Sequence, residues 1–153
     1  MITRGSADRV VKAPIQSLEA SYLVHATEDP EKIGGAVARL LALTSEAEAE
    51  TLEGHYGNQI IRARFRLTGD EASKAFEALV AEMPGDLRNE IVANVGAFID
   101  EHSALFVRLD KQQLVSGKVA SGSGDSVRVK VKPRAFLMKG SGAQFYRNLL
   151  GLS

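Results

Sequence analysis

The segment from Ile61 to Leu67 alternates between apolar residues and arginine, and this alternation limits the possible folds more than any other feature of the chain. A period of two is typical of a β-strand that lays one face on a hydrophobic core. The other face of this strand carries Arg62, Arg64 and Arg66 in a row. Because like charges on one strand face repel one another, we expect either that acidic side chains pair with the arginines or that an anion binds them.

The rest of the chain predicts short strands, several joined by hairpins, and amphipathic helices. We expect further strands over the ranges 17–26, 46–53, 104–110 and 126–132. Helices are expected to begin at Asp29, Asp70 and Asp86, with a short last helix from Gly142. Apolar residues in these segments recur at helical spacing, so each helix has one face for a core. The pattern predicts an α+β fold, with a mainly antiparallel sheet and helices on one face, in a two-layer sandwich.

The length and composition fit one globular domain. A chain of 153 residues is long enough to form a single core. We expect a loosely ordered lead-in over 1–15, a single α+β domain over 16–133 that includes a flexible loop over 116–126, and a tail over 134–153. The chain has no cysteine and no apolar run near the ~20 residues of a membrane span. These features favour a cytoplasmic protein with no membrane partner.

Basic residues gather on the polar parity of three predicted strands, although the chain as a whole has no net charge. If helices cover the apolar face of the sheet, these seven cations share the opposite face: Arg62, Arg64, Arg66, Arg108, Arg128, Lys130 and Lys132. Phe106 has the same parity and would be an exposed aromatic ring among them. Cations for phosphates and a ring for base stacking are the chemistry of RNA-binding sheets. The alternative is a solvated sheet face whose cations pair with glutamates of residues 46–53.

Two turns supply further candidates for ligand contact. The turn from Gly54 to Asn58 would project His55 and Tyr56 from a hairpin tip, where they could contact a base or ribose. The alternative is a tight hairpin in which Tyr56 folds back onto the core. Lys111 follows the strand 104–110 in a turn polar enough to hold a ligand, although Asp110 could simply cap a helical turn there.

No pattern in the chain predicts an enzyme. The three histidines show no metal-ligand spacing, and no nucleophile elbow, Walker loop or dinucleotide fingerprint is present. The acidic residues around Asp29 are interpreted as caps of a helix N-terminus. We therefore predict no catalytic residue, no cofactor and no metal ion.

Three segments of the chain resemble a known protein family. They are residues 25–32 (HATEDPEK), 50–58 (ETLEGHYGN) and 108–112 (RLDKQ). In this order and spacing they resemble an archaeal family of small RNA-binding proteins described as predicted exosome subunits, over about residues 16–132. The resemblance implies a fold like that of the fifth large-subunit ribosomal protein. Gln59 departs from the family pattern, which has a proline after the asparagine.

The resemblance implies RNA as the partner, together with a link to the exosome or to ribosome biogenesis, and it carries over no catalytic residue. With the basic strands, it predicts a non-catalytic RNA-binding protein. The alternative is a protein–protein interaction module or homodimer without direct RNA contact. In that case the apolar stripe of the last helix would pack on a partner, through Phe145, Tyr146, Leu149 and Leu150.

Overall fold

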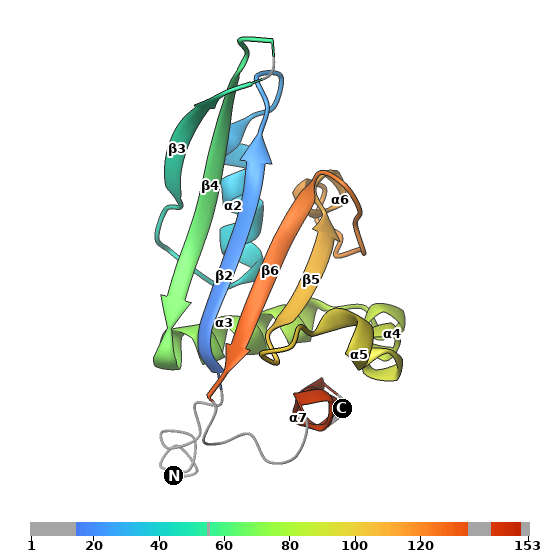
Figure 1. The fold of residues 1–153 in the computed structure, drawn as a ribbon. Helices are drawn as coiled ribbons and strands as arrows, with labels where there is room; N and C mark the ends of the chain where they lie inside the picture. Colours follow the sequence, from blue (N-terminus) through green and yellow to red (C-terminus); the bar gives the residue numbers. More distant parts are fainter. Residues whose placement is uncertain (1–14, 55, 135–141, 151–153) are drawn as a thin grey trace.

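The structure, a computed structural model, describes residues 15–54, 56–134 and 142–150 (Figure 1). Its strands are β2 (Ile15–Val24), β3 (Glu48–Glu53), β4 (Gln59–Thr68), β5 (Leu105–Asp110) and β6 (Ser126–Pro133). Its helices are α2 (Pro30–Leu40), α3 (Gly69–Glu82), α4 (Gly85–Ala93), α5 (Val95–Phe98), α6 (Lys111–Val115) and α7 (Gly142–Leu150). The strands form one five-stranded sheet in the order β3-β4-β2-β6-β5, and every neighbouring pair is antiparallel. The predicted α+β class is confirmed.

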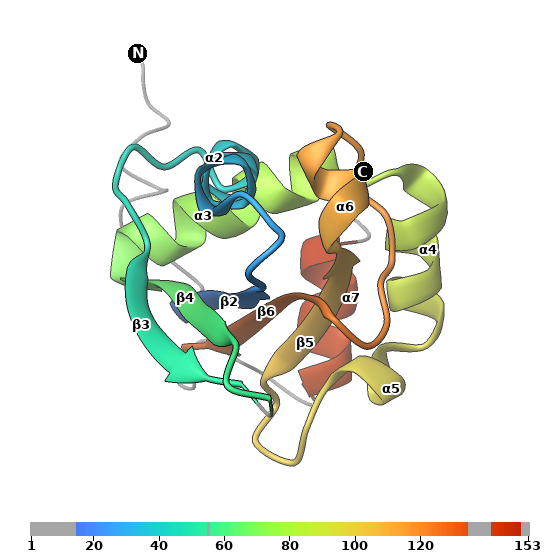
Figure 2. The ribbon, with the colours of Figure 1, turned by 90° about the horizontal axis from the view of Figure 1, so that it is seen from above.

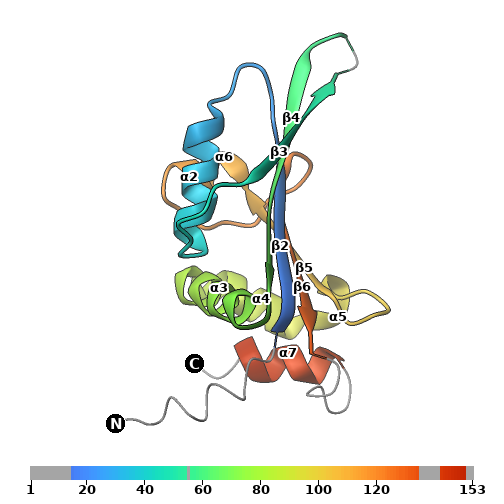
Figure 3. The ribbon, with the colours of Figure 1, turned by 90° about the vertical axis from the view of Figure 1, so that its left-hand side faces the viewer.

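The helices leave one face of the sheet largely bare. Helices α2 and α3 lie on one side of β4 and β2, and α6 lies on that same side above β5 (Figures 2 and 3). No helix of the described residues lies over the opposite face of β4, β2 and β6 (Figure 3). This opposite face is called the open face below.

The core follows directly from the two periodicities of the sequence. Alternate residues of the central strand β2, such as Leu18, Ala20 and Val24, are at most 2% exposed and point toward the helices. Val37 of α2 and Leu79 of α3 are fully buried against them. Residues of the other parity in β4 and β6 are left on the open face, which is where the sequence pattern puts the cations.

Helix starts and stops agree with the sequence pattern in part. Asp29 caps α2 as expected, because its side chain accepts hydrogen bonds from the backbone N–H groups of Glu31 and Lys32. Asp70 was expected to cap α3, and this was wrong: Asp70 lies inside the helix and Thr68 takes the N-cap position. The predicted helix from Asp86 breaks at Asn94, whose backbone is not helical and whose side-chain amide donates to the carbonyl of Glu90. Asparagine favours such local hydrogen bonds over a helix interior.

The Gly- and Ser-rich loop between α6 and β6 lies along the outer edge of β5. Asp110 N–H donates to the carbonyl of Ala120 at 2.8 Å, and Gly122 N–H donates to the carbonyl of Arg108 at 2.9 Å. A side chain at Gly122 would clash with the backbone of residues 109 and 110, so the close approach needs glycine there. Asp110 caps α6 by accepting from Gln113 N–H, as its position in the sequence suggests.

Helix α7 packs on the core of its own chain. Tyr146 and Leu150 are fully buried. The Tyr146 hydroxyl lies 2.7 Å from the carbonyl oxygen of Ser103 and 3.2 Å from that of Val131, and burial raises the pKa of this tyrosine. Phe145 stacks edge-on against Tyr146, with ring centroids 5.1 Å apart. The apolar stripe of α7 is thus occupied within the chain, which removes the feature that favoured a partner there.

None of the helices in the described ranges has the length and apolar character needed to cross a membrane.

Candidate nucleic-acid interface

The antiparallel register brings cations from β4, β6 and β5 into rows across the open face. Ser21 of β2 lies opposite Arg64 on one side and Arg128 on the other, and Arg128 in turn lies opposite Arg108. In the next row, Glu19 lies opposite Arg66 and Lys130, and Lys130 lies opposite Phe106. Directly opposed residues in a sheet point to the same face. The seven cations expected to share one face therefore do so, with Phe106 beside them.

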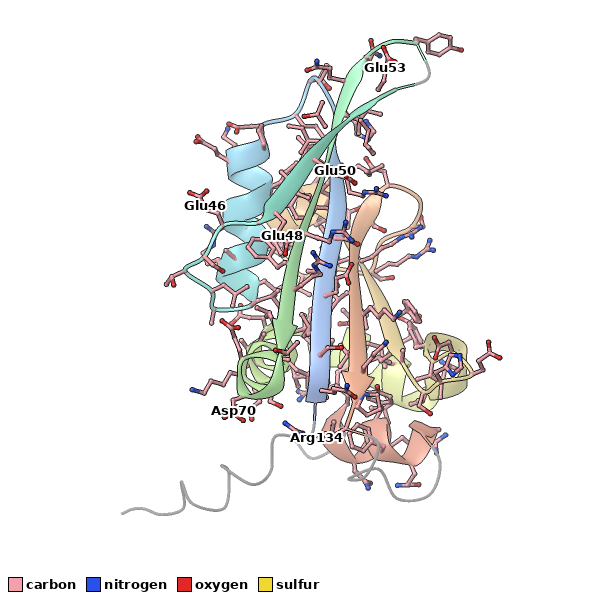
Figure 4. The ribbon with its side chains drawn as sticks, turned by 60° about the vertical axis from the view of Figure 1, so that its left-hand side comes forward. Glu46, Glu48, Glu50, Glu53, Asp70 and Arg134 are labelled. Carbon is pink, nitrogen blue, oxygen red and sulfur yellow. The ribbon has the colours of Figure 1, made fainter. Side chains whose placement is uncertain are left out.

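On the β4 side of the open face, glutamates hold the arginines. Arg62 pairs with Glu50, and its Nε lies 2.9 Å from Oε1. Arg66 forms a bidentate pair with Glu48, in which Nη2 lies 2.6 Å from Oε1 and Nε lies 3.2 Å from Oε2. These glutamates lie along the edge strand β3 (Figure 4). The hydrogen bond and charge of the partner arginine lower the pKa of both Glu48 and Glu50. On this side the solvated-face alternative describes the geometry well.

Arg64 is held less tightly than its neighbours on β4. Its Nη1 lies 3.7 Å from Oε2 of Glu19, which is an ion-pair distance but too long for a good hydrogen bond. Its side chain is 34% exposed. Of the three arginines on β4, Arg64 therefore loses least when it turns toward an external anion.

On the β5–β6 side, four cations form no salt bridge to any described residue, although Glu19 lies opposite Lys130 across the ladder and the charge of Lys130 helps to lower the pKa of Asp100. Among the described residues, no carboxylate lies within 4 Å of Arg108, Arg128, Lys130 or Lys132. Lys130 Nζ lies 5.5 Å from the centroid of the Phe106 ring, and this ring is 40% exposed. Arg108 and Arg128 are directly opposed across the ladder, an arrangement that destabilises a sheet unless an anion lies between the charges. These five residues are called the β5–β6 patch below.

The β3–β4 hairpin holds the second group of candidates away from the patch. The Tyr56 side chain is 85% exposed, so it does not fold back onto the core. The turn is closed by Gly54 N–H, which donates to the carbonyl of Asn58, and Gly57 has the positive φ of 81° expected of glycine in such a turn. The hairpin tip extends beyond the end of β2 (Figure 1). His55 lies outside the described residues.

Lys111 is buried, unlike the other candidate residues that the structure describes. It is 3% exposed, and its ammonium donates to the carbonyl of Leu23 at 2.8 Å, to Glu28 at 2.9 Å and to Asp125 at 2.8 Å. An ammonium has three protons, and all three have acceptors here. Lys111 therefore has no proton to offer a phosphate, and we leave it out of the interface.

The acceptors around Lys111 come from distant parts of the chain. His25 Nε2 lies 3.0 Å from the carboxylate of Asp125, and the backbone N–H of His25 donates to the carboxylate of Glu28. Burial raises the pKa of Glu28 and Asp125, but other contacts outweigh it and hold both pKa values below their usual range. For Glu28 these are the backbone N–H of His25 and then the hydrogen bond and charge of Lys111, and for Asp125 they are Lys111 and then His25. His25, Glu28 and Asp125 lie close enough together to ligate a metal ion. Because the ammonium of Lys111 already binds both carboxylates, these residues do not fit a metal site.

A family model described as RNA binding matches residues 17–133 of the chain. The chain belongs to this RNA-binding family. The match covers the sheet except the first two residues of β2, and it includes the β5–β6 patch and the β3–β4 hairpin.

Individual relatives agree with the family assignment. The RNA-binding protein PAB1135 from Pyrococcus abyssi is 28% identical over 84% of this chain and 88% of its own length. Among solved structures, protein AF2318 from Archaeoglobus fulgidus, a DUF54 protein, is 32% identical and superposes with a TM-score of 0.75 over 88% of this chain and 99% of its own. Protein SSO0741 from Sulfolobus solfataricus, at 24% identity, has a TM-score of 0.72 over 88% of this chain and 97% of its own, and it shows a shared fold.

Sequence reasoning missed the Lys111 network in this member of the RNA-binding family. Glu28 and Asp125 lie 83 and 14 residues away from Lys111, so no local spacing links them. The one local signal was the Asp110 cap, which starts α6 and points the next side chain inward. A lysine directly after a cap, on a helix of only five residues, is a weak signal of burial.

Proposed function

We propose that the chain binds RNA through the open face of its sheet, with the β5–β6 patch as the main contact. The observation that carries this proposal is the set of four cations on bare sheet that have no carboxylate within 4 Å in the described part of the chain. The RNA-binding family model and the name of the Pyrococcus relative, an RNA-binding protein, also support RNA as the partner.

The residues of the patch divide the work of binding in the proposed complex. Arg108, Arg128, Lys130 and Lys132 contact phosphates, which supply most of the affinity and no sequence preference. The Phe106 ring stacks on an unpaired base, a contact that any base can make. Arg62 and Arg66 contribute only where a phosphate displaces Glu50 and Glu48. His55 and Tyr56 form an outlying contact for a strand long enough to reach the hairpin tip.

Salt dependence tests this proposal directly. Four phosphate contacts on a single strand predict that log K falls against log salt with a slope of about −3. The measurement is fluorescence anisotropy of a labelled 12-nucleotide RNA between about 50 and 300 mM salt. The K130Q/K132Q variant should lower the steepness of this slope by about 1.4. No binding at the lowest salt, or a slope near zero, contradicts the proposal.

The proposal includes no chemical step: the protein acts by binding alone and takes no cofactor. The proposal also places this binding in the cytoplasm. An association with the exosome or with ribosome biogenesis is a further part of the proposal that rests only on the family resemblance, as does the likeness to the ribosomal-protein fold. Co-purification from native lysate, with sequencing of the bound RNA, tests the association. Recovery of neither exosomal nor ribosomal components would remove it while leaving RNA binding untouched.

A further inference from the structure

The sheet opens between β2 and β6 above the β5–β6 patch. Strand β2 pairs with β6 only as far as Ser21 opposite Arg128, but it pairs with β4 on to Val24 opposite Ile61. The two strands diverge beyond that point, and β6 leans away with β5 (Figure 1). The last residues of β2 therefore lack a ladder partner on their β6 side.

Lys111 holds this opening in place. Its ammonium donates to the carbonyl of Leu23, on the β2 side, and to Asp125, just before β6. The lysine thus satisfies a backbone acceptor that β6 has left, and it ties the two sides of the opening at a fixed separation. A buried polar group needs such a partner, because an unsatisfied one costs about 1–3 kcal/mol.

The opening forms a cleft of about 560 Å³ on the open face. Ser21 and Leu23 line it from β2, Arg62 and Arg64 from β4, and Arg128 from β6, with His25 at one end. The volume falls within the usual range of pockets that bind small ligands. Ser21 lies between Arg64 and Arg128 in the register, so this small side chain leaves space between two guanidinium groups.

The charges of the cleft favour an anion. Asp125 is already bound by Lys111 and His25, and Glu19 is the distant partner of Arg64. Arg128 has no acidic partner in the described ranges. A smaller depression of about 270 Å³ shares Glu19, Ser21 and Arg128 with the cleft and continues to Phe106. The cleft and the patch thus form one continuous path.

We propose that this cleft accepts one unpaired nucleotide of the bound RNA, an inference that rests on the proposed function. The phosphate lies between Arg64 and Arg128, and the base enters the gap beside Leu23 and His25. The following base then stacks on Phe106. A base inside a duplex cannot enter such a pocket without leaving its stack, which costs a few kcal/mol. The protein therefore selects single-stranded or looped RNA over duplex RNA.

The wild-type protein provides the first test. We expect at least tenfold tighter binding of a 12-nucleotide single strand than of the blunt duplex formed by the same strand and its complement, at equal salt. Equal affinity for the two RNAs overturns the inference.

A matched pair of variants provides the second test. S21I fills the cleft between the two arginines with a strand-compatible side chain. S17I places the same change on the same strand and face, outside the cleft. We expect S21I to lose at least fivefold in affinity for the single strand and none for the duplex, and S17I to change neither more than twofold. Thermal unfolding verifies that both variants fold.

The outcomes separate this inference from the proposed function. If RNA still binds with a steep salt dependence but S21I behaves like S17I, the nucleotide cleft is wrong and the sheet interface stands. If S21I fails to fold, the wild-type comparison of single strand and duplex decides the inference. If neither RNA binds at low salt, the proposed function and the inference both fall.

Discussion

Lys111 shows at the scale of one residue how the chain keeps a charge in its interior. Its ammonium is almost fully buried, yet each proton has an acceptor, two of them carboxylates. A buried ion pair contributes little net stability, because desolvation offsets the attraction. Removing the lysine is different, since it leaves the carbonyl of Leu23 and the partly buried Glu28 without this donor, while the more exposed Asp125 keeps His25 and water.

The K111M variant should therefore unfold more easily than the wild type by about 1–3 kcal/mol, the cost of leaving buried polar groups without a partner. The measurement is urea denaturation followed by circular dichroism. The triple variant K111M/E28Q/D125N should recover part of this loss, because it removes the stranded charges as well. K118M changes an exposed lysine and should stay within about 0.5 kcal/mol of the wild type. A K111M protein as stable as K118M would contradict the account of this network.

The same network makes a prediction about pH. Because the pKa values of Glu28 and Asp125 are lowered in the folded state, the two carboxylates stabilise the fold above their ordinary pKa values of 4.5 and 3.8. That stability is lost as the pH falls through the lowered values. In K111M the lysine no longer lowers the two pKa values, so the stability difference between wild type and K111M should shrink from pH 6 to pH 3. Urea denaturation at a series of pH values measures it, and a constant difference would argue against the pKa assignment.

At the scale of elements, strand β3 supplies acidic partners for two of the seven cations. All of its residues except Leu52 are exposed, and its glutamates hold Arg62 and Arg66. An edge strand with charged side chains also resists pairing with another sheet. This strand therefore narrows the interface to the opposite half of the open face.

The E48Q/E50Q variant should bind RNA more tightly than the wild type, because it frees Arg62 and Arg66 for phosphates. Exposed ion pairs are weak, so we expect a gain of about twofold to fivefold. E77Q/E82Q makes the same change of charge on helix α3, on the covered side of the sheet, and should show a smaller effect. Anisotropy with the labelled single strand compares them. An E48Q/E50Q affinity no higher than that of E77Q/E82Q would mean that Arg62 and Arg66 do not contact RNA.

The elements differ in how well the sequence predicts them. Local patterns suffice for the parity of the arginine strand and for the start of α2, where Asp29 precedes proline at the first helical position. The helix breaks at Asn94 because of the hydrogen bond made by one side chain, and the periodicity of apolar residues gives no sign of it. Which glutamate meets which arginine depends on strand register, and the gap between β2 and β6 depends on where pairing stops. Both are set by non-local packing that no local pattern encodes.

At the scale of the whole molecule, the fold separates two surfaces of different charge. Helices cover one face of the sheet (Figure 3). The cations of β5 and β6 collect on the other face, beside the exposed ring of Phe106. The chain has no net charge, so attraction to RNA must come from this local concentration of charge. The cleft above the patch then adds a reason to prefer unpaired RNA.

The central claim is that RNA lies on the β5–β6 side of the open face, and a comparison of two charge-reversal variants tests it most directly. R108E/K130E changes the patch, and R39E/K74E makes the same change of net charge at exposed positions on helices α2 and α3. With a labelled single strand at low salt, we predict that R108E/K130E loses at least 30-fold in affinity and R39E/K74E less than threefold. Equal losses in the two variants would show that only net charge matters, and would contradict the account.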